Sequence, residues 1–110
     1  MNQEDARDLQ EVLARIRGLS AAGELRVTEN GQQEMAEEDV TLGEVLEAIA
    51  AGQILENYPD HRRGPCCLVY GRTVQGRRLH IVCTSGQPVV IVITVYEPRP
   101  PKWVTPTQRG

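Results

Sequence analysis

Three runs rich in β-branched residues follow one another in the second half of the chain. They are Cys66–Tyr70, Leu79–Thr84 and Val89–Tyr96, and polar turns that contain glycine separate them. Short runs of this composition, bounded by turn residues, are typical of an antiparallel meander. The sequence therefore predicts three antiparallel strands. A fourth strand is predicted at Gln53–Tyr58, just before Pro59.

The first half of the chain has helical periodicity instead. Between Asp5 and Leu19, apolar residues recur three or four positions apart, which predicts an amphipathic helix. A second helix is predicted to begin at Thr41, because Thr41 and Glu44 have the spacing of a capping box.

Two weaker signals lie between these helices. Residues 30–39 are predicted as a short helix capped by Thr28 or Asn30, and Leu25–Thr28 as a short strand or an extended link.

The pattern as a whole predicts an α+β fold, with two or three N-terminal helices packed on one face of a three- to four-stranded antiparallel sheet. The length of 110 residues fits a single domain. We place this domain at residues 1–103 and predict a flexible C-terminal tail at residues 104–110. The four prolines after Tyr96 argue against regular structure in this region, where Trp103 is expected to act as a hydrophobic anchor.

The register of the first hairpin decides which side chains share a face of the sheet. If Arg72 lies opposite Arg77, alternation places one set of residues against the helices: Cys66, Leu68, Tyr70, Leu79, Ile81 and Cys83. The other face then carries Cys67, Val69, Gly71, Arg78, His80, Val82, Thr94 and Tyr96. A shift of one residue would reverse the assignment for a strand.

Charge is divided unequally along the chain. Residues 1–60 contain 14 acidic and 4 basic side chains, whereas residues 61–110 contain one acidic and 8 basic side chains. The basic half favours an anionic partner. An equally weighted alternative is that acidic helices pack beside a sheet whose edge arginines discourage aggregation.

The same sequence predicts a cytoplasmic protein without a membrane partner. No apolar run approaches the roughly 20 residues of a membrane span, and the N-terminus is acidic. The three cysteines, Cys66, Cys67 and Cys83, are predicted to be buried free thiols. Their spacing is not that of a metal site, so neither a metal nor a cofactor is expected. A redox or metal role for these cysteines is the alternative.

Several residues in the second half have the chemistry that RNA cleavage through the 2′-hydroxyl requires. His80 is a candidate for proton transfer, Arg72 and Arg78 for phosphate binding, and Tyr96 for base stacking or hydroxyl donation. These four are the predicted catalytic residues. A second basic set is predicted to bind RNA, namely His61, Arg62, Arg63 and Arg77. In the alternative interpretation, His80 is structural and the arginines are solvated.

A series of short motifs resembles one known family. The chain contains Tyr58-Pro59-Asp60, Gly71-Arg72, Leu79-His80-Ile81-Val82, Thr94-Val95-Tyr96-Glu97-Pro98 and Lys102-Trp103 in this order. This order is similar to that of the bacterial domain-of-unknown-function family 4258, across about residues 9 to 103.

The resemblance implies a fold similar in build to RelE-like toxins, which are small endoribonucleases, and it implies RNA and an antitoxin as partners. The family usually has His-Ala and later Arg residues where this chain has Asn30-Gly31 and then Gln33-Glu34-Met35, with Glu37 and Glu38 following. If the family's activity depends on those groups, this member is catalytically degenerate, so the sequence leaves open whether it is an enzyme.

The competing hypothesis is a non-catalytic module that binds a protein partner or forms a homodimer through the free sheet face. It rests on Val69, Val82, Val90 and Val92, which are predicted to lie on that face.

Overall fold

A computed structural model describes residues 3–110, with side chains from residue 8 onward. Met1 and Asn2, part of the acidic N-terminus, lie outside the described residues. The elements in chain order are α1 (Gln3–Ala21), β1 (Leu25–Val27), α2 (Glu29–Glu38), α3 (Leu42–Ala50), β2 (Gln53–Tyr58), β3 (Cys66–Arg72), β4 (Arg78–Thr84), β5 (Val90–Tyr96), β6 (Trp103–Thr105) and β7 (Gln108–Arg109).

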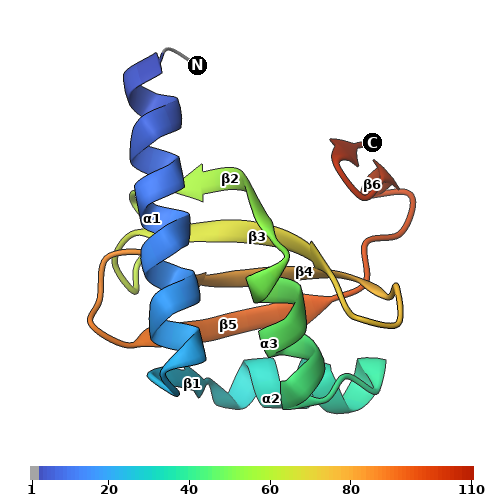
Figure 1. Cartoon of the computed structure of the whole chain (residues 1–110). Coiled ribbons are helices and arrows are strands. Elements are labelled where there is room, and N and C mark those ends of the chain that lie inside the picture. The colour runs from blue at the N-terminus through green and yellow to red at the C-terminus, as the bar shows by residue number, and fades with distance from the viewer. Residues whose placement is uncertain (1–2) are drawn as a thin grey trace.

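The central sheet has five strands in the order β1-β5-β4-β3-β2 (Figure 1). The predicted meander is confirmed, because β2, β3, β4 and β5 are antiparallel neighbours. The prediction of a purely antiparallel sheet of three or four strands was wrong. The segment predicted as a short strand or a link adds a fifth strand, since β1 pairs in parallel with β5.

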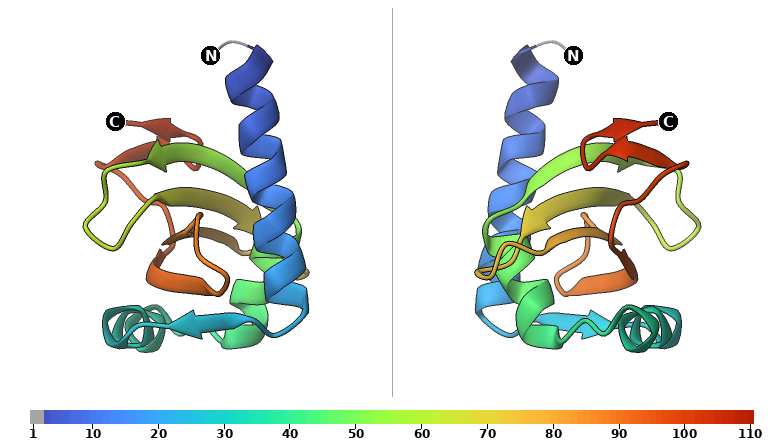
Figure 2. Two further views of the ribbon diagram at one scale, coloured as in Figure 1. Left: turned by 90° about the vertical axis from the view of Figure 1, so that its left-hand side faces the viewer. Right: turned by 90° about the vertical axis from the view of Figure 1, so that its right-hand side faces the viewer.

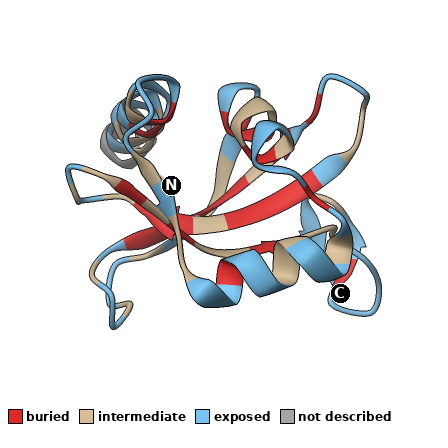
Figure 3. Ribbon diagram, turned by 90° about the horizontal axis from the view of Figure 1, so that it is seen from below, coloured by how far each residue is buried: buried red, intermediate tan, exposed pale blue. Residues whose placement is uncertain are grey.

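Helices α1 and α3 lie on one face of the sheet, as predicted, whereas α2 follows the edge of β5 (Figures 1 and 3). Side chains of α2 bind the backbone of β5 beyond the residues that pair with β1. Asn30 Nδ2 donates a hydrogen bond to Ile93 O at 3.0 Å, and Val95 N donates one to Glu34 Oε1 at 3.3 Å. Helix α2 therefore protects the part of the β5 edge that β1 does not pair with.

Both predicted helix starts are confirmed. Thr41 and Glu44 form the capping box of α3, with Glu44 N donating to Thr41 Oγ1 at 3.1 Å and Thr41 N donating to Glu44 Oε1 at 3.0 Å. Thr28, rather than Asn30, caps α2 and accepts a hydrogen bond from Gly31 N at 3.0 Å.

The predicted register of the β3–β4 hairpin was wrong by one residue. Arg72 lies opposite Arg78, not Arg77, because the turn holds five residues, with Thr73 N donating to Arg77 O at 2.8 Å. The shift moves Cys67 and Val69 to the helix face, and Tyr70 to the other face beside His80. The face assignments of β4 residues such as Leu79 and His80 were correct, so this register error affects only β3. A separate shift in the β4–β5 ladder, between Val82 and Cys83, accompanies the wrong faces predicted for Val90 and Val92.

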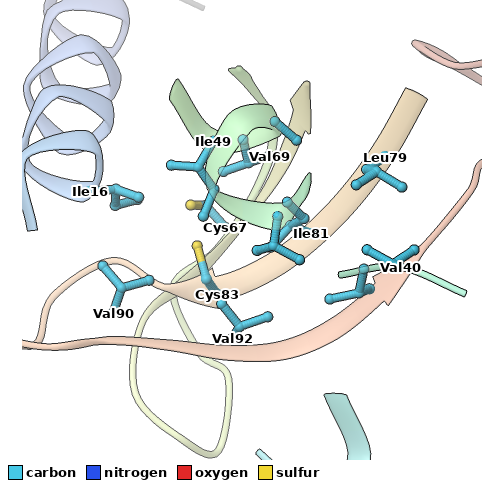
Figure 4. Packing of buried hydrophobic residues seen from close by; sticks show 13 residues of the cluster. Ile16, Val40, Ile49, Cys67, Val69, Leu79, Ile81, Cys83, Val90 and Val92 are labelled. Atoms are coloured by element: carbon cyan, nitrogen blue, oxygen red, sulfur yellow. The ribbon is translucent and has the colours of Figure 1, made fainter. Parts of the chain in front are cut away.

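The hydrophobic core lies between the sheet and helices α1 and α3 (Figure 4). It includes Val69, Val90 and Val92, for which the free face was predicted. Three of the four valines that motivate the interaction-module hypothesis are thus buried against helices.

The segment after Tyr96 contains regular structure, contrary to prediction. Strands β6 and β7 form a two-stranded hairpin that lies across the sheet from α1 (Figure 2). Trp103 anchors it, as predicted, and is 2% exposed. The prolines are tolerated because they lie in the connections and not within either strand. Among the described residues, no helix is long and apolar enough to cross a membrane.

Candidate functional site

Aromatic side chains from three adjacent strands meet on the sheet face opposite α1 and α3. His80 on β4 lies directly opposite Tyr70 on β3 and Tyr96 on β5. Trp103 of β6 covers this row, with its ring centre 4.3 Å from that of His80 in an edge-to-face arrangement. His80 is consequently 0% exposed. Two predicted catalytic residues, His80 and Tyr96, are therefore brought together but covered by the hairpin.

A chain of hydrogen bonds fixes the protonation of His80. Its Nε2 atom lies 2.6 Å from Pro106 O, a carbonyl that only accepts, so Nε2 carries the hydrogen and donates it. Its Nδ1 atom lies 3.2 Å from the Tyr96 hydroxyl. That hydroxyl also accepts a hydrogen bond from Trp103 Nε1 at 3.2 Å, which leaves it free to donate to Nδ1. Neutral His80 is thus fully satisfied.

Burial also favours the neutral forms of these groups. It is the main cause that lowers the pKa of His80, and it raises the pKa of the Tyr96 hydroxyl. A proton added to Nδ1 would remove the acceptor that the Tyr96 hydroxyl uses. In this conformation both ring nitrogens of His80 are bonded within the protein, so the imidazole has no free position for a substrate.

An ion pair fastens the hairpin over the aromatic row. Arg109 of β7 donates to both carboxylate oxygens of Glu56 on β2, at 2.5 and 2.6 Å. The hydroxyl of Tyr58 donates to the same carboxylate. The Arg109 hydrogen bond is the main cause that lowers the pKa of Glu56 to about 2. The Arg109 guanidinium also lies 4.7 Å from the centre of the Trp103 ring, where a cation is attracted.

The arginines near the β3–β4 turn divide into two kinds. Arg77 is engaged by acidic groups, since it binds the carboxylates of Glu97 and Glu44. Arg72 and Arg78 are exposed and directly opposite each other. Within the part of the chain that the structure describes, neither has an ion pair or a side-chain hydrogen bond. Arg77, which was predicted to bind RNA, is thus held in ion pairs within the protein. The guanidinium groups of Arg72 and Arg78, which were predicted to bind phosphate, are free among the described residues.

A pocket of about 340 Å³ adjoins Arg78, one member of this free pair. The β3–β4 turn and the C-terminal hairpin form its walls, and Arg78, Trp103 and Pro106 are among its lining residues. It gives access from solvent to the rim of the covered aromatic row.

The second predicted basic set lies elsewhere. His61, Arg62 and Arg63 belong to the β2–β3 loop, at the opposite end of β3 from Arg72. His61 Nδ1 accepts a hydrogen bond from Arg63 N at 3.1 Å, and Arg63 O accepts one from Gln87 Nε2 at 3.0 Å. The structure does not bring this set together with His80.

Sequence reasoning missed the residues that close the site, namely Glu56, Pro106 and Arg109. Glu56 and Arg109 are 53 residues apart in the sequence, and no local pattern connects them. Within the described part of the chain, no group of three or more His, Cys, Asp or Glu side chains is placed to hold a metal ion.

Comparisons with known proteins define a family but no activity. No curated protein matches the chain, and no solved structure does. The family described as "Domain of unknown function (DUF4258)" matches residues 27–97, from β1 to the residue after β5. The matched residues make up more than half of the chain. The protein therefore belongs to the family Domain of unknown function (DUF4258).

Proposed function

We propose that this chain is an RNA-binding protein of RelE-like build that holds RNA without cleaving it. Arg72 and Arg78 contact the phosphates, and His80 supports the fold beneath them. In this proposal RNA remains the ligand, as predicted, and the site is catalytically degenerate.

One observation carries the proposal: Arg72 and Arg78 form a cross-strand pair of like charge with no acidic partner among the described residues. Directly opposite side chains in an antiparallel pair lie close together, and like charges in this position repel each other. The same end of the molecule has acidic groups available, but these bind Arg77 and Arg99. An anion between the two free guanidinium groups would relieve the repulsion. Guanidinium groups bind phosphate through bidentate hydrogen bonds.

Two residues support the proposal that RNA is not cleaved, namely His80 and Asn30 of α2. His80 is buried, neutral and bonded on both nitrogens. Position 30, where the family usually has histidine, holds an asparagine whose amide binds Ile93 O. Without a mobile proton acceptor, the 2′-hydroxyl of a bound RNA is not activated.

A salt titration of RNA binding tests the proposal. Binding of the full chain to a labelled RNA pool that contains single-stranded and structured molecules is measured by fluorescence anisotropy, with a cleavage readout on the same samples. The logarithm of the affinity is expected to fall linearly with the logarithm of the salt concentration. Replacing Arg72 and Arg78 with alanine should lower the slope by about 1 per arginine.

The matched control is Arg26→Ala, which removes an exposed arginine from β1 at the far edge of the sheet. It should leave the slope unchanged, because it changes the net charge but not the proposed contact. No binding at low salt would refute the RNA proposal. Cleavage that disappears in His80→Ala would show instead that the protein is an active endoribonuclease.

A further inference from the structure

Two of the three cysteines face each other in the core, on the side of the sheet away from the proposed RNA contact. Cys67 on β3 lies directly opposite Cys83 on β4. Both belong to the core cluster, and each is 0% exposed. Figure 4 shows the two sulfur atoms pointing toward each other. Cys66 points to the other face of the sheet, and its thiol donates to Gly64 O at 3.4 Å.

The backbone geometry of this pair suits a disulfide bond. Residues directly opposite in an antiparallel ladder have Cα atoms about 4.5 to 5.5 Å apart. Disulfides span Cα separations of roughly 4.4 to 6.8 Å. The two strands therefore need no large displacement for a bond between Cys67 Sγ and Cys83 Sγ.

The two thiols also differ in their chemistry. A hydrogen bond from the Cys83 thiol lowers the pKa of Cys67, and the same contact, together with burial, raises the pKa of Cys83. Cys67 is therefore the sulfur of the pair that gives up its proton more readily, and Cys83 is the thiol beside it. These are the two roles needed to form and resolve an oxidised cysteine.

The pair lies near one end of β3 and β4, beside an irregularity in strand pairing. Cys67 is the second residue of β3, and the β4–β5 ladder is shifted between Val82 and Cys83. Strand ends and irregular ladders open at a lower cost than the middle of a sheet. A small oxidant can therefore reach the pair through local opening.

We propose that Cys67 and Cys83 are a redox modification site that closes to a reversible intramolecular disulfide when hydrogen peroxide oxidises it. The Cys67 thiolate attacks one peroxide oxygen, the O–O bond breaks, and the protein is left with a sulfenic acid while the other oxygen leaves as water after taking a proton. Cys83 then attacks Cys67 Sγ and displaces the hydroxyl as a second water. Two electrons pass from the two sulfurs to hydrogen peroxide, and both thiol protons end in water.

Peptide mapping of the unmutated full chain tests the site. The reduced, folded protein is treated with hydrogen peroxide, alkylated, and analysed by intact mass and by digestion. The expected result is the loss of two hydrogen atoms from the intact mass and a crosslinked peptide pair that contains Cys67 and Cys83, both reversed by dithiothreitol. Circular dichroism during the treatment shows whether the protein stays folded.

Single variants give the matched comparison. Cys66→Ser should retain the crosslink, whereas Cys67→Ser and Cys83→Ser should each lose it completely. Because either core variant can fail to fold, the mapping of the unmutated chain is decisive. Oxidation of Cys66 while Cys67 and Cys83 stay reduced would overturn the proposal, and so would a crosslink that forms only after denaturant is added.

Discussion

His80 joins the C-terminal hairpin to the sheet through its hydrogen bond to Pro106 O. A histidine side chain that is open to solvent changes its charge near neutral pH. In the folded protein the same ring is 0% exposed and is bonded to Tyr96 and Pro106. Its neutral state is therefore part of what holds the hairpin on the sheet.

Stability should consequently fall as the pH is lowered through the range where histidine titrates. The folded-state pKa of His80 lies below its unfolded value, so the unfolded chain binds the extra proton first. The contribution of His80 is complete above the unfolded pKa of about 6.5 and is lost progressively as the pH falls from there toward the folded value. Urea unfolding at a series of pH values above the range where carboxylates titrate measures the slope of the free energy of unfolding against pH.

The His80→Phe variant should lose this slope while keeping an aromatic ring in the site. It should also be less stable by about 1 to 3 kcal/mol, because Pro106 O and the Tyr96 hydroxyl lose a partner. His61→Phe is the matched control, since it removes the other histidine from a loop away from the site. Equal slopes in the native protein and in His80→Phe would show that His80 is not the titrating group.

At the scale of elements, the C-terminal hairpin depends on the ion pair between Arg109 and Glu56. Arg109→Ala should loosen the hairpin and raise the pKa of His80, because it reduces the burial that lowers this pKa and removes a nearby positive charge. Titration of the His80 ring signals by NMR measures the shift. Arg99→Ala, which breaks an exposed ion pair with Glu38, should leave the His80 pKa unchanged. No shift in Arg109→Ala would mean that Trp103 suffices to keep the site closed.

The contact between α3 and β3 depends on a glycine. A Cβ atom at Gly71 would overlap with Ala48 O, a backbone atom of α3 that no side-chain rotation can move. Gly71→Ala should therefore displace α3 and lower the free energy of unfolding by more than the 1 to 3 kcal/mol or so of ordinary overpacking. Thermal unfolding measures the loss.

Gly18→Ala provides the comparison for that substitution. Gly18 lies within α1, and a Cβ atom added there would have nothing within 4 Å, so alanine should stabilise the helix by up to about 1 kcal/mol. If Gly71→Ala were as well tolerated as Gly18→Ala, the close packing of α3 on β3 would be incorrect.

Elements with local signals could be predicted, whereas their partners could not. The capping box at Thr41 and Glu44 and the alternating strands are encoded within a few residues, and both are present in the structure. The parallel pairing of β1 was missed because Leu25 and Val90, its first pair, are far apart in sequence. A turn of five residues instead of four reversed the faces of β3, since nothing in Thr73–Arg77 fixes its length.

The candidate site shows the same limit. The residue types at Arg78, His80 and Tyr96 drew attention to the sheet face opposite α1 and α3, and the corrected register adds Arg72 to that face. Their exposure could not be predicted, because it depends on where the segment after Tyr96 folds. Prolines indicated an irregular tail, whereas the burial of Trp103 against His80 places that segment on the sheet.

For the molecule as a whole, the unequal charge of the two halves is partly cancelled in three dimensions. Arg77, Arg99 and Arg109 from the second half pair with Glu44, Glu38 and Glu56 from the first. Carboxylates of the acidic half thus neutralise some of the arginines. Arg72 and Arg78 are not paired in this way among the described residues, so they are available to an anionic ligand.

This division predicts opposite results for two neighbouring arginines. Arg77→Met should lower the free energy of unfolding by about 1 to 2 kcal/mol, because it leaves partly buried acceptors without a donor. Arg72→Met should leave stability unchanged or slightly raised, since it relieves like-charge repulsion, but it should weaken RNA binding. Urea unfolding and anisotropy on both variants separate the two roles. A loss of RNA affinity without loss of stability in Arg77→Met would reverse the assignment.

The parallel pairing of β1 with β5 also constrains the order in which the chain can fold during synthesis. The ribosome completes β1, α2 and α3 early, but the edge on which β1 pairs does not exist until Val90–Val92 have been made. Contacts between such distant segments slow folding, because a long loop must close before they form. The nascent chain therefore carries an unpaired β1 strand until Val92 has been made, which makes it a candidate for chaperone protection.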